Sequence, residues 1–244
     1  MRCYAHLKRS NLSQQQTPLS LTAVNFNGTI FYQPSRAIHH LNMSSVEKHP
    51  EKNIIRVQLK QNVVLKALDE EALAELEPQL LVVDCQKGEF LLHQGVHETE
   101  QYFVLDGILK RVVTNEQGKR MILRFTEERN MESSYAAWRL HNPTPYSIVS
   151  VTKTRIAKLP MQQCIAFMEA RPELKALYEY EVMRLMSGIM AHTITLHLLD
   201  APGRVHRFLR KQPHLFDRIP KKELASYLNI SSETLSRLKN QGKI

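Results

Sequence analysis

Short apolar runs separated by turn signals fill the middle of the chain, and they restrict its fold more than any other feature. Glycine-containing turns such as Lys87-Gly88 and Gln94-Gly95 stand between many of the runs. Regular short strands of this kind are typical of an antiparallel sandwich or barrel. The runs are Leu80–Val83, Phe90–His93, Tyr102–Leu105, Ile108–Val113, Met121–Phe125, Ser147–Val151 and Arg155–Leu159.

One turn signal predicts a specific strand pair. Asp106-Gly107 is a dipeptide that tolerates a positive φ at both central positions of a tight hairpin. The sequence therefore predicts that Tyr102–Leu105 folds back onto Ile108–Val113.

Helical periodicity flanks the apolar runs on both sides. Before them, Leu65, Leu68, Leu73 and Leu76 recur at roughly helical spacing and predict one or two short helices that end at Pro78. After Pro160 the pattern is helical again, and the stretch from Pro172 to Leu199 contains no further proline and one glycine. A helix of that length spans about 40 Å.

Within this long helix, apolar positions alternate in steps of four and three residues, which is the heptad pattern of a coiled coil. This regular seam predicts a homodimer that forms through the helix. A helix laid against its own β domain is the alternative. The seam consists of Tyr178, Val182, Leu185, Ile189, His192, Leu196 and Leu199.

The end of the chain has the pattern of a helix-turn-helix unit. The sequence Asp200-Ala-Pro-Gly203 predicts a break that serves as a hinge, and a basic helix follows over Arg204–Gln212. In the segment 218–240, a first helix is expected to end at Asn229, and Ser231 is a suitable N-cap for a second helix. The inward positions are Leu224, Ala225, Leu228, Ile230, Leu235 and Leu238.

The outer face of the second helix carries residues that can read DNA bases. Glu233 can accept from cytosine N4, and Arg237, one turn later, can donate two hydrogen bonds to guanine. The alternative is a surface ion pair between the two residues. The predicted base-reading residues are Ser232, Glu233, Ser236 and Arg237, and the predicted phosphate contacts are Lys221, Lys222, Lys239 and Asn240.

Charge supports a polyanionic partner. The formal net charge is +9, and the last 44 residues hold 10 Lys and Arg against 3 Asp and Glu. Positive charge concentrated on one small segment is typical of nucleic-acid binding.

The order of these parts resembles the Crp/Fnr family of bacterial transcription regulators: a β-roll, a long dimerisation helix, a hinge and a helix-turn-helix. The resemblance implies an α+β fold, a homodimer on double-stranded DNA, RNA polymerase as a candidate partner and a β-roll that senses an effector. The sequence near the C-terminus is especially similar to that of regulators from Bacteroidetes-type bacteria. Where the family often has an arginine before Glu233, this chain has Ser232. The resemblance is carried by Lys87–Leu92, Gly95, Tyr102–Gly107, Leu224-Ala225 and Ser231–Arg237.

The resemblance also predicts that the β-roll does not bind cyclic AMP. Nucleotide-binding relatives hold the phosphate with a Gly-Glu pair and then an Arg-Ser or Arg-Thr pair. Here Glu132 has no preceding glycine and could serve only the ribose, and Thr144-Pro145 stands where the arginine pair belongs. Arg139 is the candidate replacement for the phosphate ligand. A pocket built from Tyr135, Trp138 and Tyr146 would suit an uncharged effector.

These patterns give four predicted segments: a disordered extension over 1–50, a β-roll over 51–160, a dimerisation helix over 161–200 and a helix-turn-helix domain over 201–244. No apolar run is long enough to cross a bilayer and no secretory signal is evident, so we expect a cytoplasmic protein without membrane contact.

Two rival functions remain open at this point. The first is a cupin-like metal enzyme, because His93, His97 and Glu100 faintly resemble its metal motif, although their spacing is wrong for one strand. The second is a cyclic-nucleotide signalling module without a DNA role.

The three cysteines, Cys3, Cys85 and Cys164, are too far apart for a disulfide framework or a cysteine-rich zinc site. We expect no cofactor, no metal and no enzymatic activity.

Overall fold

The computed structural model describes residues 22–26, 29–33, 42–97 and 99–241. The chain forms two compact units, residues 1–38 and residues 39–244. In the first unit, strands β1 (Thr22–Phe26) and β2 (Thr29–Gln33) pair antiparallel. The predicted segments after residue 51 therefore all belong to one compact unit.

The disordered extension predicted over residues 1–50 is wrong at its C-terminal end. Strand β3 (Asn42–Ser45) pairs with β4 (Leu81–Cys85), and Val46 is fully buried beside it. These residues fold because they complete the edge of a sheet and place an apolar side chain in the core. Apart from β1 and β2, the part of the extension before Asn42 lies outside the described residues.

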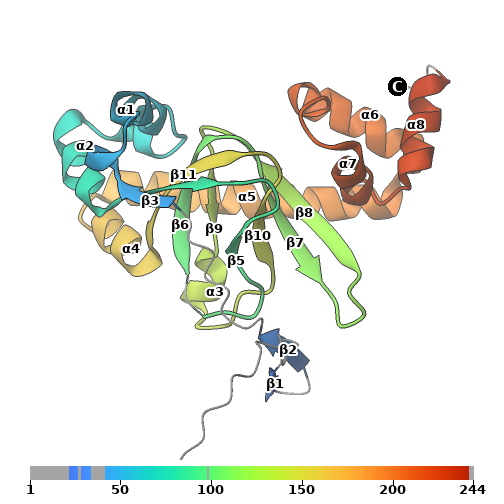
Figure 1. The fold of residues 1–244 in the computed structure, drawn as a ribbon, viewed down its shortest axis with the longest axis horizontal. Helices are drawn as coiled ribbons and strands as arrows, with labels where there is room; N and C mark the ends of the chain where they lie inside the picture. The colour runs from blue at the N-terminus through green and yellow to red at the C-terminus, as the bar shows by residue number, and fades with distance from the viewer. Residues whose placement is uncertain (1–21, 27–28, 34–41, 98, 242–244) are drawn as a thin grey trace, which may run out of the picture. The chain divides into compact units, whose positions relative to one another are not determined.

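Two antiparallel sheets form the β-roll, as the apolar runs predict (Figure 1). One sheet has the strand order β3-β4-β11-β6-β9 and the other has the order β5-β10-β7-β8. Each predicted run corresponds to one strand. The remaining strands are β5 (Phe90–Leu92), β6 (Glu100–Asp106), β7 (Leu109–Thr114), β8 (Arg120–Thr126), β9 (Met131–Ser133), β10 (Ser147–Ser150) and β11 (Thr154–Pro160).

The hairpin predicted at Asp106-Gly107 is wrong. Strand β6 pairs with β9 and β11, whereas β7 pairs with β8 and β10, so the two strands lie in different sheets. Gly107 has the expected positive φ of 86°, and a Cβ there would collide with the backbone of Lys153 and Thr154. The dipeptide therefore forms a corner at which the chain passes from one sheet to the other.

The described part of the chain contains eight α-helices. Short 3₁₀ segments precede or follow several of these helices, namely Val46–Lys48, Leu65–Ala67, Glu77–Gln79 and Pro213–Leu215. The helices are α1 (Lys52–Lys60), α2 (Glu70–Leu76), α3 (Tyr135–Arg139), α4 (Met161–Glu169), α5 (Pro172–Leu198), α6 (Ala201–Lys211), α7 (Lys221–Tyr227) and α8 (Ser232–Asn240).

The hinge predicted at residues 200–203 is shorter than expected. Helix α6 already begins at Ala201, because Asp200 caps it by accepting from the Gly203 amide at 2.9 Å. Pro202 is tolerated in the first turn, where its missing amide hydrogen has no intrahelical partner. The break in the helix is thus limited to Leu199 and Asp200.

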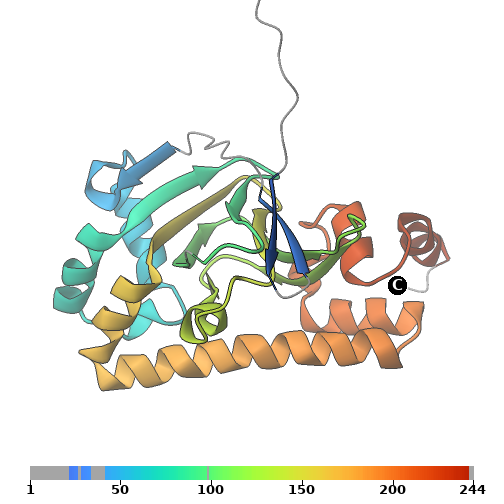
Figure 2. The ribbon, with the colours of Figure 1, turned by 90° about the horizontal axis from the view of Figure 1, so that it is seen from below.

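Helix α5 runs along the β-roll from α4 to α6 (Figure 2). The predicted dimer seam faces the body of its own chain: Tyr178 is 0% exposed and Leu185 is 8% exposed. The other seam residues, Val182, Ile189, His192, Leu196 and Leu199, are partly buried. Tyr178 and Leu185 therefore pack within their own chain, as the alternative predicts, and dimerisation through the seam stays a prediction.

A second apolar stripe lies on the outward face of α5. Met183 is 63% exposed and Met190 is 65% exposed. The four members of the stripe are spaced by three, seven and four residues, which is a heptad row with Ser187 at one of its positions. Its members lie one or two positions after residues of the predicted seam. We call it the outer stripe, and it consists of Tyr180, Met183, Met190 and Ile194, with Met186 and Leu198 beside it.

Candidate nucleic-acid interface

The N-terminus of α8 has the capping geometry that the sequence predicts. The Ser231 hydroxyl accepts from the Thr234 amide at 3.1 Å, and Leu235 and Leu238 are buried. Asn229, at the corner between α7 and α8, has a positive φ of 50°, which asparagine tolerates better than most residues. The corner and the cap together fix the direction in which the outer face of α8 points.

All four predicted base-reading residues lie together on that outer face. Ser232, Glu233, Ser236 and Arg237 line one shallow hollow, which Asn240 and Gln241 extend. Hydrogen bonds from its own amide and from Ser231 hold the pKa of Glu233 below its ordinary value of 4.5. Glu233 and Arg237 form no ion pair with each other within the described part of the chain. The alternative of a surface ion pair is thus not observed.

Exposed cations flank this hollow. Lys221 and Lys222 are exposed at the start of α7, and Lys239 and Asn240 are exposed at the end of α8. The ammonium of Lys239 lies 5.7 Å from the centre of the Phe216 ring. The surface around α8 therefore combines exposed positive charges with the polar side chains of its centre, as a DNA-binding face requires.

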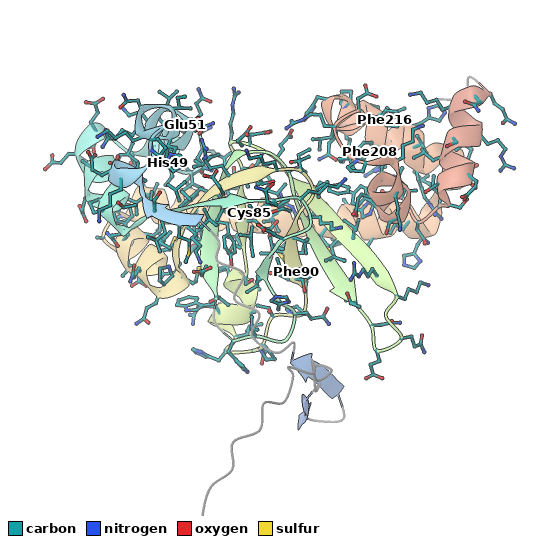
Figure 3. The ribbon with its side chains drawn as sticks, viewed as in Figure 1. His49, Glu51, Cys85, Phe90, Phe208 and Phe216 are labelled. Atoms are coloured by element: carbon teal, nitrogen blue, oxygen red, sulfur yellow. The ribbon has the colours of Figure 1, made fainter. Side chains whose placement is uncertain are left out.

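Helices α6 to α8 share an apolar core with the β-roll. Phe125 of β8 lies with its ring centre 5.1 Å from that of Tyr227, and Phe208 lies 5.9 Å from Tyr227 on the other side. Figure 3 shows Phe208 and Phe216 among the C-terminal helices. The β-roll contributes Ile108, Val112, Ile122, Phe125, Val149 and Val151, and the helices contribute Val205, Phe208, Leu215, Ile219, Leu224, Ala225, Leu228, Leu235 and Leu238.

Polar contacts surround this shared core. Lys110 of β7 donates to Glu223 of α7 at 2.6 Å, and Arg218 pairs with Glu128. His192 of α5 stacks on Tyr227 with ring centres 3.8 Å apart and donates from Nε2 to the Tyr227 carbonyl at 3.0 Å. Burial lowers the pKa of His192 to about 4, with Arg207 and Arg204 adding to the effect, so the ring is neutral at pH 7.

A charged cluster fills the interior of the β-roll. Glu132 is fully buried and accepts from Arg111 Nε at 3.0 Å and from the Thr126 hydroxyl at 2.7 Å. The Arg111 guanidinium lies 4.0 Å from the centre of the Tyr146 ring. Burial alone would raise the pKa of Glu132, but Arg111 and Arg124 outweigh it and hold that pKa below 4.5.

Comparisons with known proteins agree with this arrangement. Residues 82–171 match the cyclic nucleotide-binding domain family. The chain is 26% identical over 190 residues to the nitrogen fixation regulation protein FixK of Bradyrhizobium diazoefficiens, covering 73% of this chain and 78% of FixK. It is 22% identical to the global transcriptional regulator CRP of Haemophilus influenzae, covering 61% of this chain and 70% of CRP.

Solved structures show the same fold. FixK2 from Bradyrhizobium japonicum superposes with a TM-score of 0.57 at 16% identity, over 66% of this chain and 85% of FixK2. The global regulator CLP of Xanthomonas campestris gives a TM-score of 0.59 at 15% identity, over 71% of this chain and 92% of CLP. The relatives and structural neighbours of this chain are thus Crp/Fnr-type transcription regulators.

The predicted effector residues lie in two neighbouring groups. Glu132 and Tyr146 both contact Arg111, but Tyr135 packs edge-on against Tyr178 of α5 at 5.7 Å. Trp138 lies beside Tyr135, with ring centres 5.9 Å apart, and Arg139 is exposed at the end of α3. The pocket predicted from these five residues stays a prediction.

Sequence reasoning missed Arg111, the residue that fills the interior of the regulator's β-roll. The available signal was Lys110-Arg111, two cations within an otherwise apolar run. A charge inside a buried strand requires a partner of opposite charge, so the pair Arg111 and Glu132 could have been sought.

The rival metal site is not assembled. The His93 ring stacks on Phe90 at 4.6 Å, and Glu100 pairs with Lys158. Among the described residues, no group of three or more His, Cys, Asp or Glu side chains is placed to hold a metal ion. A search of the same residues for a helix both long and apolar enough to span a membrane found none.

Proposed function

We propose that the regulator is a homodimer that binds a near-palindromic DNA site with the outer face of α8. The observation that carries this proposal is the hollow formed by Ser232, Glu233, Ser236 and Arg237, in which Arg237 has no carboxylate partner in the described structure. A guanidinium held in this way is available for the two acceptor atoms of guanine. Lys221, Lys222, Lys239 and Asn240 would then position the protein through the phosphates.

The proposed dimer forms through the outer stripe of α5 rather than through the predicted seam. Large exposed apolar side chains in a regular row are costly to leave in water and mark an interaction surface. The row has the heptad spacing of a coiled coil, with Ser187 in place of one apolar residue, so a second copy of α5 is the occupant that fits it. RNA polymerase as a further partner and a cytoplasmic location rest on the resemblance to the family.

Selection from random duplex DNA by the full chain tests the DNA-binding proposal. We expect an enriched sequence with two inverted halves whose centres lie about 34 Å apart, which is one turn of DNA. A control chain in which Ser232, Glu233, Ser236 and Arg237 are all alanine should enrich no sequence. Enrichment of the same sequence by both chains would contradict the proposed role of α8.

The β-roll is proposed not to bind cyclic AMP, although the CRP relatives are named cAMP-activated regulators. Three features support this. Glu132 already accepts a hydrogen bond from Arg111. Thr144-Pro145 stands in place of the expected arginine pair, and Arg139 is exposed. Titration calorimetry with cyclic AMP and cyclic GMP should give only heats of dilution. Micromolar binding of either nucleotide that is abolished by Arg139→Ala would contradict the proposal.

A further inference from the structure

A small cavity lies between the β-roll, α5 and the helix-turn-helix. Its volume is about 180 Å³. Apolar side chains such as Phe125 and Leu185 form part of its wall, and the guanidinium-bearing residues Arg124 and Arg184 also line it. Gln212 and Tyr227 close it from the side of the C-terminal helices. None of the effector residues predicted from the sequence lines this cavity.

Arg124 is the unusual member of the lining. Its side chain is only 20% exposed, yet its guanidinium donates no hydrogen bond within the described part of the chain. The nearest carboxylate oxygen is Glu132 Oε2, at 3.5 Å from Arg124 Nε. That oxygen already accepts from Thr126, and the other oxygen of Glu132 accepts from Arg111. A guanidinium has five N–H donors, so most of those of Arg124 lack an acceptor.

The charges around the cavity do not balance. Arg124 in the cavity wall and Arg111 behind it share one carboxylate, that of Glu132, whereas Arg184 is half exposed and has Glu181 as its partner. Glu181 forms an ion pair with Arg184, whose Nε donates to the carboxylate at 2.7 Å. Burial, together with the nearby charges of Arg111 and Arg184, lowers the pKa of Arg124 below its ordinary value. Burying a cation is costly unless an anion accompanies it, and one negative charge is missing here.

We propose that this cavity binds a small organic anion, whose carboxylate or phosphate group accepts from Arg124 while its short apolar body packs against Phe125 and Leu185. Arginine is well suited to this task because its fork matches both anionic groups with two parallel hydrogen bonds. An engineered apolar cavity of about 150 Å³ binds benzene, so a cavity of 180 Å³ admits a molecule of similar size. The site is therefore sized for an anion of a few carbon atoms rather than for a nucleotide.

The position of the cavity gives the anion a route to DNA binding, and this step rests on the proposed function. Tyr227 belongs to α7 and packs on both Phe125 of β8 and His192 of α5. An occupant would touch the β-roll, α5 and the DNA-binding helices at once. A ligand shifts an equilibrium between arrangements only through its different affinity for each of them, and this site is lined by all three parts.

Titration calorimetry on the full chain tests the site with inorganic phosphate, succinate and benzoate as probes. Benzamide is the uncharged match to benzoate. We expect saturable binding of at least one anion, no binding of benzamide, and a loss of affinity of about tenfold or more in Arg124→Gln, because charge-assisted hydrogen bonds are removed. The matched control is Arg120→Gln, which removes an exposed arginine from the same strand.

A second variant keeps the proposal testable if Arg124→Gln does not fold. Glu181→Gln removes a competing carboxylate from the lining and should tighten anion binding. The proposal is overturned if the wild type binds none of the three anions saturably, if Arg124→Gln and wild type bind equally, or if Arg120→Gln loses as much affinity as Arg124→Gln.

DNA binding is measured in parallel by fluorescence anisotropy, with and without the bound anion. Anion binding without any DNA binding would refute the proposed function and leave the site standing. DNA binding without any anion binding would refute the site alone.

Discussion

Arg237 lies one helical turn after Glu233 on the exposed face of α8, and no carboxylate in the described structure neutralises it. We expect Arg237→Ala to lose about 1–3 kcal/mol of preference at one symmetric pair of base positions. The matched variant Lys222→Ala should weaken all sequences alike, because an exposed lysine contacts phosphates. Competition binding on matched and mismatched sites at fixed salt distinguishes the two. Uniform weakening by Arg237→Ala would contradict base reading.

Glu132 depends on Arg111 to remain ionised in the interior of the β-roll. We expect Arg111→Met to destabilise the fold by about 3–5 kcal/mol, because it leaves a buried carboxylate without its main partner. The control is Lys60→Met, which removes an exposed ion pair and should change stability little. Urea denaturation at pH 7 measures both variants. Equal stability of Arg111→Met and wild type would show that the pair contributes nothing.

Acid should reveal the same ion pair. The folded-state pKa of Glu132 is lower than its ordinary value of 4.5, so its stabilising effect is complete above that value and is lost as the pH falls through the folded-state pKa. The part of the acid sensitivity due to Glu132 should be absent in Glu132→Gln.

At the scale of elements, the apolar runs predicted the positions of the strands well. The pairing partners of each strand and the buried face of α5 were harder to predict. Asp106-Gly107 determines a turn conformation, but the neighbours of β6 are decided by pairing with β9 and β11, which lie far away in the sequence. Helix α5 is apolar on two faces, so its sequence contains two heptad-like rows. Periodicity cannot say which row faces the chain's own core, because both rows are apolar.

This ambiguity gives a prediction about α5. The double variant Met183→Glu/Met190→Glu should keep its fold and become monomeric, because both side chains are exposed in the single chain. Leu185→Glu should instead destabilise the fold itself, because Leu185 is buried within the chain. Analytical ultracentrifugation and circular dichroism measure these effects. A double variant that remains a dimer would place the interface elsewhere.

On the scale of the whole molecule, the predicted recognition helix was located correctly, but its attachment to the β-roll was not visible in the sequence. The attachment uses Phe125, Lys110 and His192, and each contacts a partner in α7. Single apolar or charged residues on different elements leave no periodic signal. The sequence could therefore predict a DNA-binding unit and not the surface on which it rests.

His192 should make this attachment sensitive to acid. Its folded-state pKa is about 4, below the ordinary 6.5, so the unfolded chain binds more protons between those values. Stability should therefore be complete above pH 6.5 and fall between pH 6.5 and 4, by at most about 1.4 kcal/mol per pH unit. His192→Phe keeps an aromatic stack on Tyr227 and should lack this part of the decline. Chemical denaturation at pH 7, 6 and 5 compares the two chains, and identical pH profiles would rule out His192 as the cause.

The shared core of β7, β8 and helices α6 to α8 limits what can be done with the DNA-reading end of the molecule. A fragment cut at Asp200 would expose the apolar faces of Val205, Phe208 and Leu224, and the remaining β-roll would expose Ile108 and Phe125 in turn. Each piece would carry half of a single interior. The C-terminal helices therefore cannot be transferred to another sensor domain by joining the chains at residue 200. A chimera between regulators of this kind would also have to include the two strands.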